Sequence, residues 1–169
     1  MKKLKEIIAG GQDDSAWDNA WKGGVTPWDA KVVQLPLYTL IESARFPLPK
    51  EGRALVPGCG SGYDAIFIAE SLGLHTVAVD ISPTALDAGR TLLASLEDPA
   101  LASRLTFLEA DFFELALPED KKFDLVYDYT FFVAIPPARR LEWGRQISAL
   151  TKPGAYLITL MFPLDQDPG

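Results

Sequence analysis

Three acidic residues close behind apolar segments are the first candidates for chemistry in this chain. Asp80, Asp111 and Asp128 each follow a short run of β-branched, aliphatic or aromatic residues. A carboxylate accepts several hydrogen bonds, and an acid after the second strand of a nucleotide-binding α/β fold grips ribose hydroxyls. Each acid could instead be a turn residue or a loop cap. Their repetition behind successive apolar segments favours one shared binding site.

A glycine-rich segment precedes Asp80 by about 20 residues. The apolar residues 53–56 lead into three alternating glycines, Gly58, Gly60 and Gly62. Glycine adopts backbone angles that other residues resist, and it lets a ligand lie against the main chain. The spacing differs from the dinucleotide pattern Gly-x-Gly-x-x-Gly. It is associated with methyltransferases that use S-adenosylmethionine (SAM), although a plain glycine-rich turn would also explain it.

Cys59 and His75 are the single cysteine and the single histidine of the 169 residues. We interpret Cys59 as a small packing residue of the glycine segment and His75 as a structural residue that opens a strand. One cysteine cannot form an intrachain disulfide, which fits a reducing, cytoplasmic setting. We expect no metal site.

The composition is that of one globular domain, with 48% hydrophobic and 23% charged residues. A net charge of −7 without a basic run disfavours nucleic acid and anionic membranes as partners. No apolar run reaches the length of a membrane span, and the first eight residues lack the features of a secretory signal. A small-molecule partner is therefore favoured.

Predicted strands and helices alternate along the chain. Strands are expected at 53–56, 75–79, 105–109, 123–127 and 155–162. Helices are expected at 30–44 with a kink at Pro36, and at 64–72, 82–96 and 137–150, with a turn at 152–154 before the last strand. This alternation predicts an α/β fold with a doubly wound, mostly parallel sheet. The domain would span residues 1–169, with residues 1–28 lying as a lid over a core of residues 29–169.

Four segments together resemble one family. They read Trp17-x-x-x-Trp21-x-x-Gly24-x-Thr26-x-Trp28, then Leu-Val-Pro-Gly-Cys-Gly-Ser-Gly-Tyr-Asp at 55–64, Tyr-Asp-Tyr-Thr-Phe-Phe at 127–132, and Leu-Ile-Thr-Leu-Met-Phe-Pro at 157–163. The chain resembles the thiopurine S-methyltransferase-like family, and within it the thiol and halide/thiocyanate methyltransferases of plants and fungi. The resemblance implies a Rossmann-like class I methyltransferase that uses SAM and releases S-adenosylhomocysteine.

The resemblance also implies roles for the N-terminal aromatic residues. Trp17, Trp21 and Thr26 would line the cofactor pocket, Trp28 would lie near the substrate, and Tyr129 beside the cofactor. A simple hydrophobic staple to the core is the other explanation of the tryptophans. With the strand-end residues, the expected cofactor contacts are Trp17, Trp21, Thr26, Gly58, Cys59, Gly60, Gly62, Asp80, Ile81, Asp111, Phe112, Asp128 and Tyr129.

These contacts divide one adenosyl ligand into parts. Asp80 would hold the ribose hydroxyls, Asp111 would accept from the adenine amino group, and Phe112 would pack near the adenine ring. Asp128 and Tyr129 would lie near the reacting centre and are the candidate catalytic residues.

Methyl transfer to a thiol, bisulfide, thiocyanate or halide needs alignment and exclusion of water more than proton handling. Residues 127–130 lack the Asn/Asp-Pro-Pro-aromatic pattern of enzymes that methylate amino nitrogens. Both considerations favour a small, soft nucleophile as acceptor. The sequence does not identify a base for a thiol that must lose its proton.

Two departures keep alternatives open. Val56-Pro57 stands where many methyltransferases have an acid, and the chain ends at Gly169, where the family continues into further strands. We therefore expect missing C-terminal strands and an exposed edge at 155–162 that favours self-association. One alternative is a truncated module that binds SAM with little or no activity. A nicotinamide-dependent oxidoreductase is another, and the glycine spacing and the tryptophans argue against it.

Overall fold

A five-stranded sheet with the order β3-β2-β1-β4-β5 forms the centre of the molecule, and every neighbouring pair is parallel. The computed structural model describes residues 15–161. The strands are β1 Arg53–Pro57, β2 His75–Asp80, β3 Leu105–Glu109, β4 Phe123–Tyr129 and β5 Thr151–Leu160. The predicted α/β class and parallel sheet are confirmed. The strand order reverses between β1 and β4, where such sheets bind ligands.

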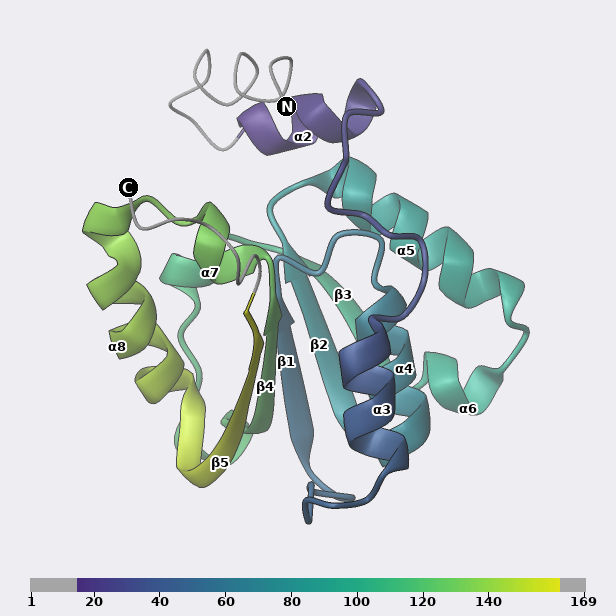
Figure 1. Cartoon of the computed structure of the whole chain (residues 1–169), viewed down its shortest axis with the longest axis vertical. Helices are drawn as coiled ribbons and strands as arrows, with labels where there is room; N and C mark the ends of the chain where they lie inside the picture. Colours follow the sequence, from purple (N-terminus) through teal and green to yellow (C-terminus); the bar gives the residue numbers. More distant parts are fainter. Residues whose placement is uncertain (1–14, 162–169) are drawn as a thin grey trace.

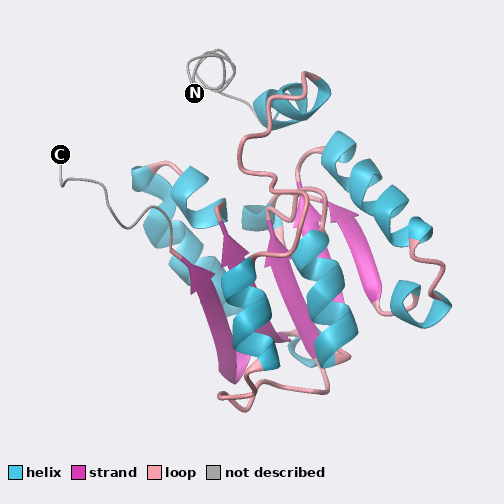
Figure 2. Ribbon diagram, turned by 45° about the vertical axis from the view of Figure 1, so that its right-hand side comes forward, coloured by secondary structure: helices cyan, strands magenta, loops and turns pink. Residues whose placement is uncertain are grey.

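Helices cover both faces of this sheet (Figure 1), as the doubly wound prediction requires. One side carries α3 Leu35–Glu42, α4 Tyr63–Leu72 and α5 Pro83–Ser95, and the other carries α8 Arg140–Leu150. The shorter elements are α6 Pro99–Ala102, α7 Phe131–Ala134, and the 3-10 helices η1 Phe112–Glu114, η2 Glu119–Lys121 and η3 Pro137–Arg139. Helix α2, Ser15–Lys22, lies beyond the end of the sheet to which the strand arrows point (Figure 2).

An apolar core lies between each face of the sheet and the helices that cover it, and β4 contributes residues to both cores. Leu125 and Tyr127 pack with the helices that include α4, whereas Val126 packs with Ile147 and Leu150 of α8. Successive side chains of a strand point to opposite faces. Tyr129 therefore shares a face with Tyr127, and Asp128 shares the other with Val126.

The helix predicted for residues 30–44 is shorter than expected. It begins at Leu35, and Pro36 lies in its first turn. Proline is tolerated there because the first N–H groups of a helix have no partner within it. Pro36 therefore starts the helix and does not kink it.

The turn predicted for residues 152–154 lies inside β5. The pairing of β4 with β5 shifts register between Phe123 and Leu125, and Gly154 has a φ of 82°. A bulge of this kind lets a strand continue past residues that cannot pair regularly, including a proline.

None of the helices in the described part of the chain combines the length and the apolar character that a bilayer crossing requires.

Candidate functional site

The glycine loop and the acid at the end of β2 are joined directly. Gly58, Gly60 and Gly62 have φ of 59°, 54° and 77°, which only glycine adopts without strain. The Gly60 N–H donates to Oδ2 of Asp80 at 2.8 Å, and the Ser82 N–H donates to Oδ1 at 2.9 Å. Burial raises the pKa of Asp80, against the lowering effect of these N–H groups. Each carboxylate oxygen can still accept a further hydrogen bond.

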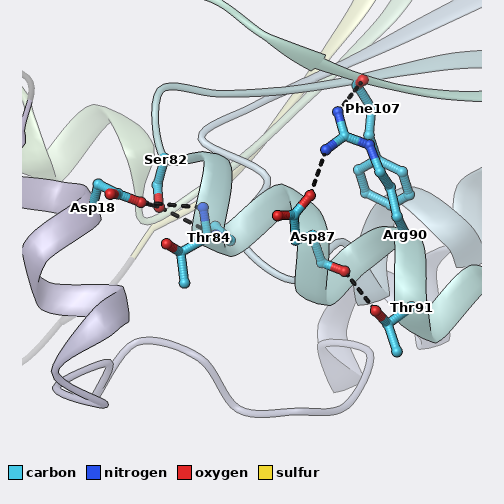
Figure 3. Close-up of polar contacts among 8 residues, drawn as sticks. Asp18, Ser82, Thr84, Asp87, Arg90, Thr91 and Phe107 are labelled. Carbon is cyan, nitrogen blue, oxygen red and sulfur yellow. Dashed lines mark hydrogen bonds and ion pairs between the residues drawn. The ribbon is translucent and has the colours of Figure 1, made fainter.

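Helix α2 is tied to the start of α5 (Figure 3). Oδ1 of Asp18 accepts from the Ser82 hydroxyl at 2.8 Å and from the Thr84 N–H at 3.1 Å. Burial acts to raise the pKa of Asp18, but its bonds with Lys22, Thr84 and Ser82 outweigh it and hold that pKa well below the ordinary value. An acid from α2 thus acts as a cap for the N-terminus of α5.

Three tryptophans gather over the glycine loop. The ring of Trp28 lies 5.5 Å from that of Trp17 and 6.4 Å from that of Trp21, with both pairs edge to face. A Cβ placed on Gly60 would lie 3.1 Å from the Trp21 ring. The aromatic segment therefore covers the loop at contact distance.

A cavity of about 50 Å³ remains between the loop, the tryptophans and β4. Its principal side chains are those of Trp21, Trp28, Asp29, Gln34, Cys59, Ser61, Tyr63, Asp64, Tyr127, Tyr129 and Thr130. Pockets that bury a drug-sized ligand measure about 300–1,000 Å³. The cavity is therefore smaller than such a pocket.

The charged groups of the cavity wall are two carboxylates, and no Lys, Arg or His of residues 15–161 lines it. The Gln34 N–H donates to Oδ1 of Asp64 at 2.8 Å, and the Ser61 hydroxyl donates to Oδ1 of Asp29 at 2.9 Å. Burial raises the pKa of Asp64, against the lowering effect of the Gln34 N–H and the Tyr127 hydroxyl.

The acids of the cavity wall affect the pKa values of the two tyrosines of β4. Burial, followed by the charge of Asp64, raises the pKa of both Tyr127 and Tyr129. The Tyr127 hydroxyl is buried and makes no well-formed hydrogen bond within the described residues. Both tyrosines are therefore neutral at physiological pH, and the Tyr127 hydroxyl lies near the carboxylate of Asp64.

Sequence reasoning missed Asp29, Asp64 and Tyr127. An acid in the first turn of the helix after the glycines is a usable signal for Asp64, since carboxylates are favoured at helix N-termini. The alternation of Tyr127 with Tyr129 is the signal for a shared face of β4.

Asp128, which was expected beside the reacting centre, is not part of the cavity wall. It is 1% exposed, and its Oδ1 accepts from the Phe132 N–H at 3.1 Å. Burial raises its pKa to about 6, against the lowering effects of the Phe132 N–H and the Trp143 indole. The strand alternation that turns Tyr129 toward the cavity turns Asp128 toward α8.

Other expected contacts also lie outside the cavity wall. Oδ1 of Asp111 accepts from the Phe113 N–H at 2.8 Å and caps η1. Phe112 is 3% exposed and packs edge to face on Phe131, with ring centroids 5.1 Å apart, so its ring belongs to the core. Trp17, Thr26, Asp80 and Ile81 are likewise absent from the wall, whereas Trp21, Trp28, Gly58, Cys59, Gly60, Gly62 and Tyr129 form part of it.

Cys59 behaves as a packing residue of the loop. Burial, and then the charge of Asp80, raises the pKa of its thiol well above the ordinary value, so it remains protonated. His75 opens β2 at the opposite end of the sheet and is exposed. Within residues 15–161, no cluster of three His, Cys, Asp or Glu is arranged to hold a metal ion.

Comparison with known proteins gives this site a family. The sequence profile described as "Thiopurine S-methyltransferase (TPMT)" matches residues 12–169. The chain belongs to this family. Among its curated relatives, the "Probable thiol methyltransferase 2" of Arabidopsis thaliana is 42% identical over 153 residues, which are 90% of this chain and 64% of the relative. The "Thiocyanate methyltransferase 1" of Brassica oleracea is 38% identical over 93% of this chain and 66% of its own length. The chain thus spans just under two thirds of these family members.

Solved structures agree on the fold. A protein from the conversion of a disulfide bond into a thioacetal group during echinomycin biosynthesis superposes with a TM-score of 0.70 at 24% identity, over 85% of this chain and 58% of that one. The glycopeptide N-methyltransferase MtfA, solved with SAM, superposes with a TM-score of 0.62 at 20% identity, over 78% and 55%. At these identities the likeness establishes a Rossmann-like methyltransferase fold for this family member.

Proposed function

We propose that this chain binds SAM and transfers its methyl group to a small, soft nucleophile: a thiol, bisulfide, thiocyanate or halide. The observation that carries the proposal is the carboxylate of Asp80, held between the N–H groups of Gly60 and Ser82 beside the glycine loop. Membership of the TPMT family and the names of the plant relatives supply the acceptor class.

The residues present fit SAM at several points. Asp80 keeps free acceptor positions for ribose hydroxyls, and Asp111 stands at the end of the neighbouring strand for the adenine amino group. The glycines have positive φ angles and carry no side chains, so the loop backbone can lie close to a cofactor bound between the loop and Trp21. Aromatic faces attract cations, so Trp21, Trp28 and Tyr129 suit a sulfonium. When bound, SAM supplies a methyl group on sulfur that is open to in-line attack.

The protein's own contribution is alignment and exclusion of water. Trp28 and Tyr129 form the walls between which an acceptor would enter, and the segment of residues 17–28 would close over the cofactor as a lid. Asp128 has no part in this arrangement, because its carboxylate faces α8. We assign the reacting end to Tyr129 and Trp28.

Two measurements test the proposal. Titration calorimetry with SAM, S-adenosylhomocysteine and NAD on one sample should show binding of the first two and none of NAD. A methyl-transfer assay should then show products from 2-mercaptoethanol, bisulfide, thiocyanate or iodide, with an amine and a phenol as comparison acceptors. Binding of NAD in place of SAM would contradict the cofactor, and transfer to the amine or phenol alone would contradict the acceptor class. Binding of SAM without transfer to any acceptor would leave a cofactor-binding module.

We also propose that the protein is cytoplasmic and that it self-associates. The single cysteine supports a cytoplasmic location. The edge strand β5 supports self-association, since it pairs only with β4 among residues 15–161, and Tyr156 and Leu157 are exposed. Residue 162 of the predicted edge lies outside the described residues.

A further inference from the structure

The proposed acceptors differ in whether they must lose a proton before they attack. Thiocyanate and iodide are anions without a proton to lose, whereas an alkyl thiol is largely neutral near pH 7 and attacks effectively only as the thiolate. An enzyme that methylates neutral thiols therefore gains from a proton acceptor beside the acceptor site. The inference below rests on the proposed function and deepens it.

Few groups in the cavity could take that proton. The titratable side chains of its wall are Asp29, Cys59, Tyr63, Asp64, Tyr127 and Tyr129. Cys59, Tyr127 and Tyr129 are held in their protonated forms by burial. Apart from the phenol of Tyr63, the groups that remain are the two carboxylates.

Their hydrogen bonds distinguish the two carboxylates. Oδ1 of Asp29 accepts from both the Ser61 hydroxyl and the Lys31 N–H and fastens the segment after Trp28. Asp64 receives one backbone N–H, from Gln34, and faces the Tyr127 hydroxyl. That hydroxyl is buried without a well-formed hydrogen bond in residues 15–161. The hydroxyl and the carboxylate can therefore still form hydrogen bonds that the structure does not show.

The setting of Asp64 also suits a carboxylate that gains a proton. It stands in the first turn of α4, where the helix N-terminus favours the ionised form, but burial acts in the opposite direction and raises its pKa. Asp29 and Tyr129 are the other ionisable groups near it in the cavity wall. No positive side chain of the described residues lines this cavity to hold the carboxylate permanently ionised.

We propose that Asp64 is the proton acceptor for neutral thiol substrates and that Tyr127 is the residue that positions its carboxylate. The S–H bond breaks, its electron pair stays on sulfur as the thiolate, and the proton forms an O–H bond on the carboxylate of Asp64. After the reaction this proton passes to water. Acceptors that carry no proton bypass this step.

The decisive experiment compares two acceptors on one variant. Asp64→Asn keeps an oxygen for the Gln34 N–H but cannot take a proton. Methyl transfer to 2-mercaptoethanol at pH 7 should fall by about 100-fold or more, the scale of general base catalysis. Transfer to thiocyanate and binding of S-adenosylhomocysteine should stay at the unsubstituted level. Asp87→Asn, an exposed acid of α5 paired with Arg90, is the matched control and should change neither rate.

The pH profile adds a readout that a merely structural residue would not move. The rate on 2-mercaptoethanol should rise with pH as Asp64 ionises, and this limb should be absent with thiocyanate. Tyr127→Phe removes a hydroxyl that lowers the pKa of Asp64, so it should shift the limb to higher pH. An unshifted limb would remove Tyr127 from its positioning role.

The carboxyl ¹³C titration of Asp64, assigned by its loss in Asp64→Asn, should have a midpoint above about 3.9, the ordinary aspartate value. A midpoint at or below that value overturns the inference whether or not methyl transfer is observed. Equal losses on both acceptors with weaker S-adenosylhomocysteine binding would overturn it too, and would assign Asp64 to the ammonium group of the cofactor. If the unsubstituted protein methylates no acceptor, the proposed function itself fails.

Discussion

The carboxylate of Asp80 holds the backbone of Gly60, 20 residues earlier in the chain, through a hydrogen bond of 2.8 Å. The same side chain accepts from the Ser82 N–H and so connects the β1–α4 loop to the β2–α5 turn. The acid that we propose as the ribose ligand is thus also part of the frame of the glycine loop. A substitution there acts on binding and on the loop at once.

Asp80→Ala should therefore weaken binding of S-adenosylhomocysteine by about 1.5–3 kcal/mol, the scale of a hydrogen bond to a charged group. Titration calorimetry measures the loss, and urea unfolding measured in parallel separates it from loosening of the loop. Asp87→Ala, on the exposed side of α5, should leave the affinity unchanged. Unchanged affinity in Asp80→Ala itself would exclude Asp80 from the ligand site.

Asp18→Ala should release α2 from the start of α5. It leaves the Thr84 N–H and the Ser82 hydroxyl without their acceptor, a loss of about 0.5–2 kcal/mol by analogy with helix caps. Calorimetry should show weaker cofactor binding, and deletion of residues 1–28 should weaken it further while the remaining chain still unfolds cooperatively.

Lys22→Ala separates the two roles of Asp18, because it removes the ion pair and keeps the acceptor for the Ser82 hydroxyl and the Thr84 N–H. It should weaken cofactor binding less than Asp18→Ala does. Full cofactor affinity in the chain that lacks residues 1–28 would rule out a lid.

Gly62→Ala should destabilise the protein by about 1–3 kcal/mol, because overpacking and a positive φ both penalise a side chain at this position. The φ of Gly62 is 77°, and an added Cβ would lie 2.6 Å from the Phe107 ring. Gly144→Ala makes the matched comparison inside α8, where no atom lies within 4 Å of the added Cβ. It should stabilise the protein by about 0.5–1 kcal/mol in urea unfolding. A neutral Gly62→Ala would mean that the loop relaxes freely.

The buried carboxyl of Asp128 should make stability fall as pH rises. Its pKa is about 6 in the folded protein against an ordinary value of 3.8, so the folded state binds more protons between these values. The free energy of unfolding therefore declines from pH 4 to pH 6 by up to about 3 kcal/mol from this group. Asp128→Asn should lose this contribution, and the difference between the two proteins in urea unfolding at pH 4 and pH 7 measures it. A pH-independent difference would contradict the raised pKa.

Leu157→Lys should reduce self-association through β5. Leu157 is 45% exposed on the edge strand, and a lysine on an edge opposes pairing with another chain. Sedimentation velocity at several concentrations should show less dimer than in the unsubstituted protein. Leu141→Lys tests exposure alone, because Leu141 is 69% exposed on α8, away from the strand edge. A monodisperse unsubstituted protein at high concentration would refute the proposal.

Helices that begin or end at a capping residue were predictable from the sequence. Gly73 ends α4 with a φ of 70°, Ser82 caps α5 by accepting from the Ala85 N–H, and β3 has the expected bounds. The two helix boundaries were predictable because glycine tolerates a positive φ after a helix and a serine side chain caps the start of one. Pro36 and the proline inside β5 were misplaced because proline is compatible with a helix start and with a bulge, as well as with a kink or a turn.

The site was less predictable because its residues meet through strand order. Asp64 faces Tyr127 since β4 lies next to β1, although 63 positions separate the two residues in the sequence. Asp128 and Tyr129 were expected to act together, but the alternation of β4 sends them to opposite faces. Two successive residues at the end of a strand lie at the same end of the sheet, but their side chains point to opposite faces.

The bond between Asp18 and the start of α5 sets the resting state of the site. While α2 is docked, Trp21 lies against Gly60 and leaves a cavity of about 50 Å³. Undocking breaks hydrogen bonds at Thr84 and Ser82, so the closed arrangement is favoured before any ligand arrives. A ligand that enters beneath α2 would have to break these bonds, and their return over the bound ligand would retain it. We therefore expect one carboxylate cap on a helix to lengthen the residence time of whatever fills the pocket.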